Sequence, residues 1–152
     1  PIDEDEDYYD ECVKLVENLG LQEKVVFTGR ANVLEYYSFL DLLLLTSISE
    51  GQPLSILEGL AAGIPFISTD VGNCREILLE KTDIGEAGVI IPPTSYTDLA
   101  LSLVQLYHNP EKLKEFSKNG KKIVNKYYSK ESFIQRYREI YDEMKGVEEW
   151  QE

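Results

Sequence analysis

Two apolar runs separated by a short segment that contains glycine and proline constrain the fold more than any other feature. Residues 42–45 are four consecutive leucines, and residues 66–69 read Phe-Ile-Ser-Thr. Short runs of this kind are typical of strands buried in a parallel sheet. Residues 46–65 between them predict a loop and then a short helix. The stretch is therefore expected to form a strand, loop, helix, strand unit.

Proline and glycine mark the two ends of the expected helix. Pro53 lies where a missing N–H costs least, in the first helical turn, and Gly63 is typical of a helix end. The helix is therefore expected over residues 53–62. It is apolar on nearly every side, and Ala61 and Ala62 are expected to let it approach a sheet closely.

Two carboxylates stand out against this apolar background. Glu50 lies in the loop before the helix, and Glu58 lies about one and a half turns inside it. Both are expected to face the cleft above the carboxyl ends of the strands. Between them, the first-turn N–H groups of Leu54 and Ser55 are free donors at the positive end of the helix dipole, which suits phosphate. A nucleotide sugar offers a diphosphate for the amides and hydroxyl groups for the carboxylates.

The same stretch resembles a known family. Glu50 and Glu58 have seven residues between them, Gly51 follows the first, and residues 61–65 read Ala-Ala-Gly-Ile-Pro. This pattern resembles the signature of retaining GT-B glycosyltransferases in the large family GT4. A pair of glutamates alone would be weak evidence for this family, but the whole stretch of residues 46–65 is a specific match.

A second segment narrows the resemblance to one branch. Residues 46–54 together with residues 69–76, which read Thr-Asp-Val-Gly-Asn-Cys-Arg-Glu, are most similar to the branch that includes the Pel exopolysaccharide glycosyltransferase. The resemblance covers about residues 8–145. It implies an α/β fold: a Rossmann-like parallel sheet with helices on both faces, the C-terminal half of a GT-B enzyme without its first strand.

The resemblance also implies an activity. The chain is expected to bind a nucleotide diphosphate sugar, expected to be a UDP-sugar, as substrate. The enzyme is expected to transfer its hexose to a polysaccharide or glycan acceptor with retention of configuration. No further cofactor and no metal is implied. The only Asp-x-Asp spacings lie in the acidic run of residues 3–7, which is expected to be a solvated turn rather than the metal motif of the other major glycosyltransferase fold. The electrostatic work is to stabilise the departing diphosphate.

Roles for individual residues follow from the resemblance. Glu50 is the expected catalytic residue, holding the donor hexose, and Glu58 is expected to hold the ribose hydroxyls. The other expected donor-binding residues are Gly51, Gln52, Leu54, Ser55, Arg30 and Ala31. Positioning by Glu50 is preferred to nucleophilic attack, because retaining glycosidases need a second carboxylic acid across the scissile bond. Many family members have Phe and Gly in place of Gln52 and Pro53, and Pro53 removes one N–H donor. The family's basic residues that hold the diphosphate have no assignable match, and Arg75 is the nearest candidate.

Further elements are predicted by hydrophobic spacing and capping residues. They are helices at residues 8–19, 32–40, 95–107, 110–127 and 129–144, and strands at residues 25–28 and 88–91. Four strands alternating with helices predict a doubly wound parallel sheet. Arg30 and Ala31 follow the strand at residues 25–28, where Arg30 either stacks on a base or is a solvated cation. Tyr37 is taken as a packing residue.

Length, charge and cysteine content exclude several classes of protein. The 152 residues predict a single domain, spanning residues 1–152, and the net charge of −13 makes nucleic acid and anionic membranes poor partners. No run approaches the roughly 18 apolar residues of a membrane helix, so a cytoplasmic location is expected. Cys12 and Cys74 are expected to be ordinary thiols. Because the chain opens at Pro1 on an acidic run, it is expected to be a fragment whose acceptor domain is absent and which is inactive alone.

Three functions remain open at this point. The first is the donor-binding domain of a glycosyltransferase. The second is a degenerate transferase domain kept for interactions, against which the presence of Glu50, Gly51 and Glu58 argues. The third is a receiver-like regulatory domain with Asp70, at a strand end, as its phosphoacceptor. A receiver needs an acidic metal pocket and a lysine near a late strand end, where this chain has Pro92 and Pro93.

Overall fold

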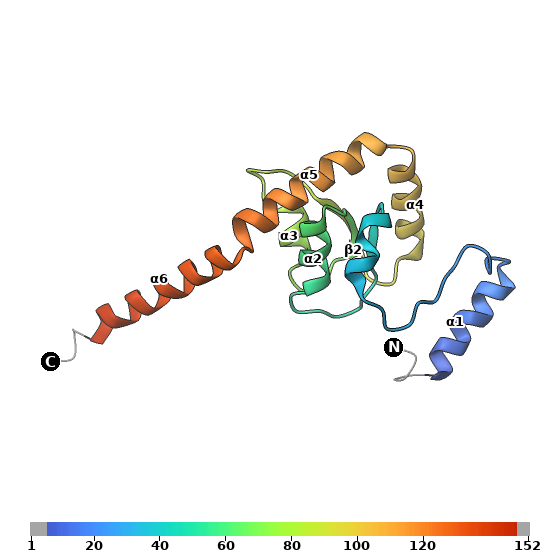
Figure 1. Cartoon of the computed structure of the whole chain (residues 1–152), viewed down its shortest axis with the longest axis horizontal. Coiled ribbons are helices and arrows are strands. Elements are labelled where there is room, and N and C mark those ends of the chain that lie inside the picture. Colours follow the sequence, from blue (N-terminus) through green and yellow to red (C-terminus); the bar gives the residue numbers. More distant parts are fainter. Residues whose placement is uncertain (1–5, 149–152) are drawn as a thin grey trace. The chain divides into compact units, whose positions relative to one another are not determined.

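The computed structural model describes residues 6–148, which divide into two compact units. The first unit extends to Tyr36 and contains helix α1 (Glu6–Asn18) and the 3₁₀ helix η1 (Val33–Glu35). The second unit begins at Tyr37 and contains the sheet and all the other helices of the described residues (Figure 1). No helix among residues 6–148 is long and apolar enough to cross a membrane.

Three parallel strands form the sheet of the second unit. They lie side by side in chain order as β1 (Leu43–Leu45), β2 (Phe66–Thr69) and β3 (Gly88–Ile91). Phe66 is in register with Leu43 on one side and with Gly88 on the other. Parallel neighbours need a crossover connection, and α2 (Leu54–Ala62) and α3 (Cys74–Leu79) provide the two crossovers. Every residue of the central strand β2 is buried.

The remaining helices of the second unit are η2 (Tyr37–Phe39), α4 (Tyr96–Tyr107), α5 (Pro110–Tyr127) and α6 (Lys130–Glu148). Helices α4, α5 and α6 agree closely with the expected ones. The Ser95 side chain caps α4 by accepting from the N–H of Asp98. Gly63 ends α2 in the left-handed conformation with φ of 89°, which only glycine adopts without cost. The predicted end of α2 at Gly63 and the predicted Ser95 cap of α4 are therefore confirmed. Pro53, expected in the first turn of α2, instead lies just before the helix with ψ of 116°.

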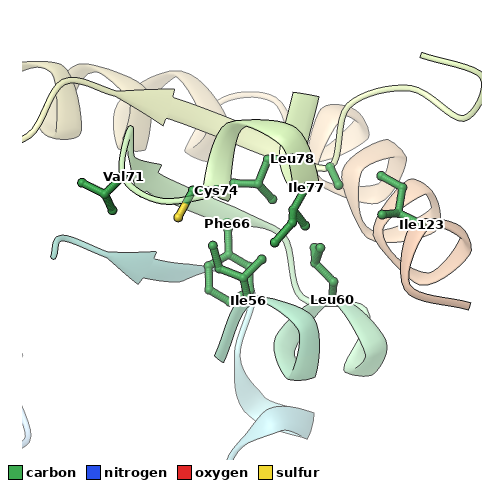
Figure 2. Packing of buried hydrophobic residues seen from close by; sticks show 9 residues of the cluster. Ile56, Leu60, Phe66, Val71, Cys74, Ile77, Leu78 and Ile123 are labelled. Atoms are coloured by element: carbon green, nitrogen blue, oxygen red, sulfur yellow. The ribbon is translucent and has the colours of Figure 1, made fainter. Parts of the chain in front are cut away.

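Apolar side chains cover both faces of the sheet. Because neighbouring residues of a strand point to opposite sides, Phe66 and Ile67 belong to two different clusters. The first cluster is the larger and consists of Ile56, Leu60, Phe66, Val71, Cys74, Ile77, Leu78, Ala87 and Ile123 (Figure 2). The second consists of Ile67, Ile91, Leu106 and Phe116. Helix α5 contributes to both clusters, through Ile123 and Phe116.

Glycine, rather than alanine, lets α2 approach the sheet. A methyl group on Gly59 would lie 2.5 Å from Phe66 Cε2 and 2.6 Å from Leu43 Cδ1, so a side chain there must displace these groups or the helix. Ala61 and Ala62 are both exposed, so neither packs against the sheet. The expectation that the two alanines provide the close contact is therefore wrong.

Two predicted elements of the N-terminal part are also wrong. Residues 25–28 form no strand, and Val26 is 82% exposed. A strand needs a neighbour for its N–H and C=O groups, and the described part of the first unit holds none. The predicted helix over residues 32–40 is instead two separate 3₁₀ turns. Asn32 caps the first as expected, accepting from the N–H of Leu34 at 3.3 Å. So short a segment is marginal as an α-helix.

Candidate functional site

The loop between β1 and α2, residues 46–53, carries Glu50. Its carboxylate is half-buried and accepts a hydrogen bond from Ser47 Oγ at 2.7 Å. The main chain of Ser47 is tied in turn to the central strand, because Thr69 Oγ1 donates to the Ser47 carbonyl oxygen at 2.6 Å. The Glu50 carboxylate is therefore oriented from the carboxyl end of β2 through Ser47.

The turn between β2 and α3, residues 70–73, lies against the same loop. The N–H of Asn73 donates to the Gly51 carbonyl oxygen at 3.0 Å. Gly72 has φ of 51°, and a methyl group there would overlap the Gly51 carbonyl oxygen and lie 2.8 Å from that of Glu50. The predicted site residues Glu50 and Gly51 therefore rest on a second loop that the sequence motif did not reveal.

The N-terminus of α2 is open. Pro53 precedes the helix with φ of −70° and ψ of 116° and gives it no side-chain cap. Leu54 is 66% exposed, and Ser55 and the preceding Gln52 are exposed as well. The first-turn N–H groups of a helix have no partner within it, so this end retains donors for an anion.

Glu58 shares the exposed face of α2 with the first-turn residues. Leu54 and Ser55 precede it by four and three residues, the spacing of neighbours on a helix surface, and all three are exposed. Tyr37 Oη of η2 donates to Glu58 Oε2 at 3.4 Å. Burial, and then the charge and hydrogen bond of Glu58, raise the pKa of Tyr37. Tyr37 is thus a neighbour of the site, which its place among packing aromatics did not indicate.

Arg30 and Ala31 belong to the first unit. They follow Gly29, which has φ of 60°, at the end of the irregular segment where a strand was expected. Arg30 is exposed and Ala31 half-buried. Their part in donor binding stays a prediction.

Asp70 and Arg75 bind each other at the end of β2. Arg75 Nε donates to both Asp70 carboxylate oxygens at 3.1 Å, and Nη2 lies 2.6 Å from Oδ2. The hydrogen bonds from Arg75 lower the pKa of Asp70. Arg75 therefore already has an anionic partner, which weakens it as a diphosphate ligand. Among the side chains that the structure describes, residues 6–144, no three of His, Cys, Asp or Glu gather as metal ligands do.

Comparison with known proteins shows the family of the chain. A profile of the family described as "Glycosyl transferases group 1" matches residues 4–123. The chain is 30% identical over 130 residues to N-acetyl-alpha-D-glucosaminyl L-malate synthase of Bacillus anthracis, covering 85% of this chain and 33% of that protein. It is 26% identical over 135 residues to the lipopolysaccharide core biosynthesis mannosyltransferase LpsB of Rhizobium meliloti (strain 1021), covering 88% and 38%.

A solved structure shows the same fold. The Anabaena protein HepE, crystallised with UDP, superimposes with a TM-score of 0.80 at 22% identity, over 91% of this chain and 37% of HepE. The chain spans about a third of the length of the curated relatives named above. The parallel sheet, the open start of α2 and the matched profile agree, and the chain belongs to the group 1 glycosyl transferases.

Proposed function

We propose that the chain is the donor-binding part of a retaining glycosyltransferase. The enzyme transfers a hexose from a nucleotide diphosphate sugar to a polysaccharide or glycan acceptor. The observation that carries the proposal is the exposed start of α2 with Glu50 in the loop before it and Glu58 one turn further on. Family membership supports it, as do the N-acetylglucosaminyl and mannosyl groups that the names of the two relatives specify. HepE, which has the same fold, binds UDP.

Each part of the site has a proposed role. The main-chain N–H groups of Leu54 and Ser55 take the diphosphate oxygens and stabilise the charge that develops as the glycosidic bond breaks. Glu58 accepts hydrogen bonds from the ribose hydroxyls. Glu50, with the main chain of Gly51 and Gln52, holds the hexose in the orientation for transfer. Glu50 acts by positioning, without a covalent intermediate and without a required metal.

The acceptor site is proposed to lie in another part of the protein. The chain covers about a third of the length of the two relatives named above. In the family that the sequence resembles, basic residues hold the diphosphate, and no residue of this chain is assigned to that role. We therefore propose that the chain alone is inactive. The similarity of residues 46–54 and 69–76 to the Pel branch suggests an exopolysaccharide acceptor.

Titration of the intact protein that carries this chain tests the proposal directly. UDP is expected to bind with measurable heat in a calorimeter. One member of a panel of nucleotide sugars is then expected to be hydrolysed, or its sugar transferred, with the configuration at the anomeric carbon retained. NMR of the anomeric proton monitors this configuration. Absence of binding by any nucleoside diphosphate in the panel, with the protein shown to be folded, would contradict the proposal. Inversion at the anomeric carbon would contradict the retaining mechanism alone.

A further inference from the structure

We propose that Thr69 and Gly72 are positioning residues that shape the hexose half of the donor site. This inference rests on the proposed function. Both residues belong to the end of β2 and the turn that follows it, outside the motif that carries Glu50 and Glu58. Each lies against the main chain of the loop of residues 46–53, Thr69 at Ser47 and Gly72 at Gly51.

Thr69 acts on the first half of the loop. Its side chain is only 2% exposed, and Oγ1 donates to the Ser47 carbonyl oxygen at 2.6 Å, with the Leu45 carbonyl oxygen 3.4 Å away. A buried hydroxyl with acceptors at these distances fixes the main chain it contacts. The Ser47 side chain then donates to Glu50 at 2.7 Å. The direction of the Glu50 carboxylate therefore depends on the Thr69 hydroxyl.

Gly72 acts on the second half of the loop. The N–H of Asn73, the next residue, holds the Gly51 carbonyl oxygen at 3.0 Å. This approach is possible because position 72 has no Cβ: a methyl group would overlap the same oxygen, and main chain cannot swing aside as a long side chain can. The loop and the turn fit together only with glycine at this position. A side chain there displaces the Glu50 and Gly51 main chain away from the sheet.

The nucleotide half of the site is held by other contacts. Leu54, Ser55 and Glu58 lie on α2, which packs on the sheet through Gly59 against Phe66. Neither Thr69 nor Gly72 is part of that packing. Replacing either residue is therefore expected to weaken binding of the hexose far more than binding of the nucleotide. A general loss of stability would weaken both alike.

The main experiment compares Gly72→Ala with Gly20→Ala in the intact protein. Both glycines have positive φ, 51° and 67°, so both changes carry similar backbone strain, but Gly20 has nothing within 4 Å of its would-be Cβ. Displacing a reacting group by on the order of 1 Å lowers the rate of a reaction about a hundredfold. For Gly72→Ala we expect turnover to fall about a hundredfold and the Kd of the nucleotide sugar to rise about tenfold, with the Kd of UDP within about twofold. Gly20→Ala is expected to leave all three unchanged.

A second pair of variants covers the case in which Gly72→Ala does not fold. Thr69→Val keeps the shape of the side chain and removes the hydroxyl, whereas Thr69→Ser keeps the hydroxyl. The valine variant is expected to show the same selective loss for the nucleotide sugar, and the serine variant is expected to restore most of it. Thermal unfolding of every variant, with and without UDP, identifies those that remain folded.

The outcomes separate the inference from the proposed function. If the unchanged protein binds no nucleotide, the proposed function fails. If it binds and turns over a nucleotide sugar, but folded Gly72→Ala or Thr69→Val protein does so equally well, the positioning role is wrong. An equal loss of affinity for UDP and the nucleotide sugar would also overturn it, because that pattern indicates general loosening of the fold.

Discussion

Glu50 and Glu58 reach their positions by different means. Glu50 is half-buried and held by the Ser47 hydroxyl at 2.7 Å, so its geometry depends on the loop around it. Glu58 projects from a regular helix, is exposed, and has a longer contact of 3.4 Å with Tyr37. A carboxylate has about four acceptor positions, so Glu58 retains capacity for two ribose hydroxyls.

Replacement of Glu58 tests its proposed role. In the intact protein, Glu58→Ala is expected to weaken UDP binding by about 1–3 kcal/mol, the range for charged hydrogen bonds left unmade. The loss is expected to vanish for 2′,3′-dideoxy-UDP, which has no ribose hydroxyls to hold. Calorimetric titration of both ligands measures this difference. Glu131→Ala, an exposed carboxylate in the first turn of α6, is the control and is expected to bind both ligands normally. Equal loss for the two ligands would contradict the ribose assignment.

Single residues were predictable where their partners are close in sequence. The caps formed by Asn32 and Ser95 were found because a capping side chain bonds to the main chain two or three residues ahead. The sequence did not predict Tyr37 as a neighbour of the site, because its partner Glu58 is 21 residues away. Thr69 was missed for the same reason, since Ser47 is 22 residues away. No local pattern encodes contacts that form only when the sheet assembles.

Elements were predictable where several signals coincide. The strands at residues 66–69 and 88–91 and the helix at residues 110–127 have the bounds expected from apolar spacing, proline and capping residues. The segment at residues 25–28 has the composition of a strand and forms none, because a strand also depends on a neighbour that composition cannot supply. The sequence also predicted the wrong residues for the close contact between α2 and the sheet, Ala61 and Ala62 instead of Gly59. Close contact depends on which face of the helix meets the sheet, and composition does not give that face.

A larger side chain at Gly59 is expected to push α2 off the sheet. The Gly59→Ala change adds helix propensity worth about 1 kcal/mol, but overpacking against Phe66 and Leu43 costs about 1–3 kcal/mol. We therefore expect a net fall of up to about 2 kcal/mol in the free energy of unfolding, measured in urea. Gln105→Ala at an exposed position of α4 is the control, expected within about 0.5 kcal/mol of the unchanged protein. A Gly59→Ala protein more stable than the original would show that the helix can shift without cost.

The whole chain combines two units of very different burial. Among residues 6–36 of the first unit, no residue is buried, whereas all four residues of β2 in the second are. Hydrogen exchange is slow only where opening the structure costs free energy. The amides of α1 are therefore expected to exchange far faster than those of β2, as measured by mass spectrometry of peptic fragments. Comparable protection in the two regions would show that the first unit is stabilised by contacts of its own.

The architecture of the second unit depends strongly on α5. Phe116 and Ile123 are two turns apart on one helix, yet they belong to the apolar clusters on opposite sides of the sheet. Unwinding this helix would open both clusters to water together. Any truncation or transplant that is to keep the loops of residues 46–53 and 70–73 in place must therefore include α5, because without it both layers of helices lose part of their contact with the sheet.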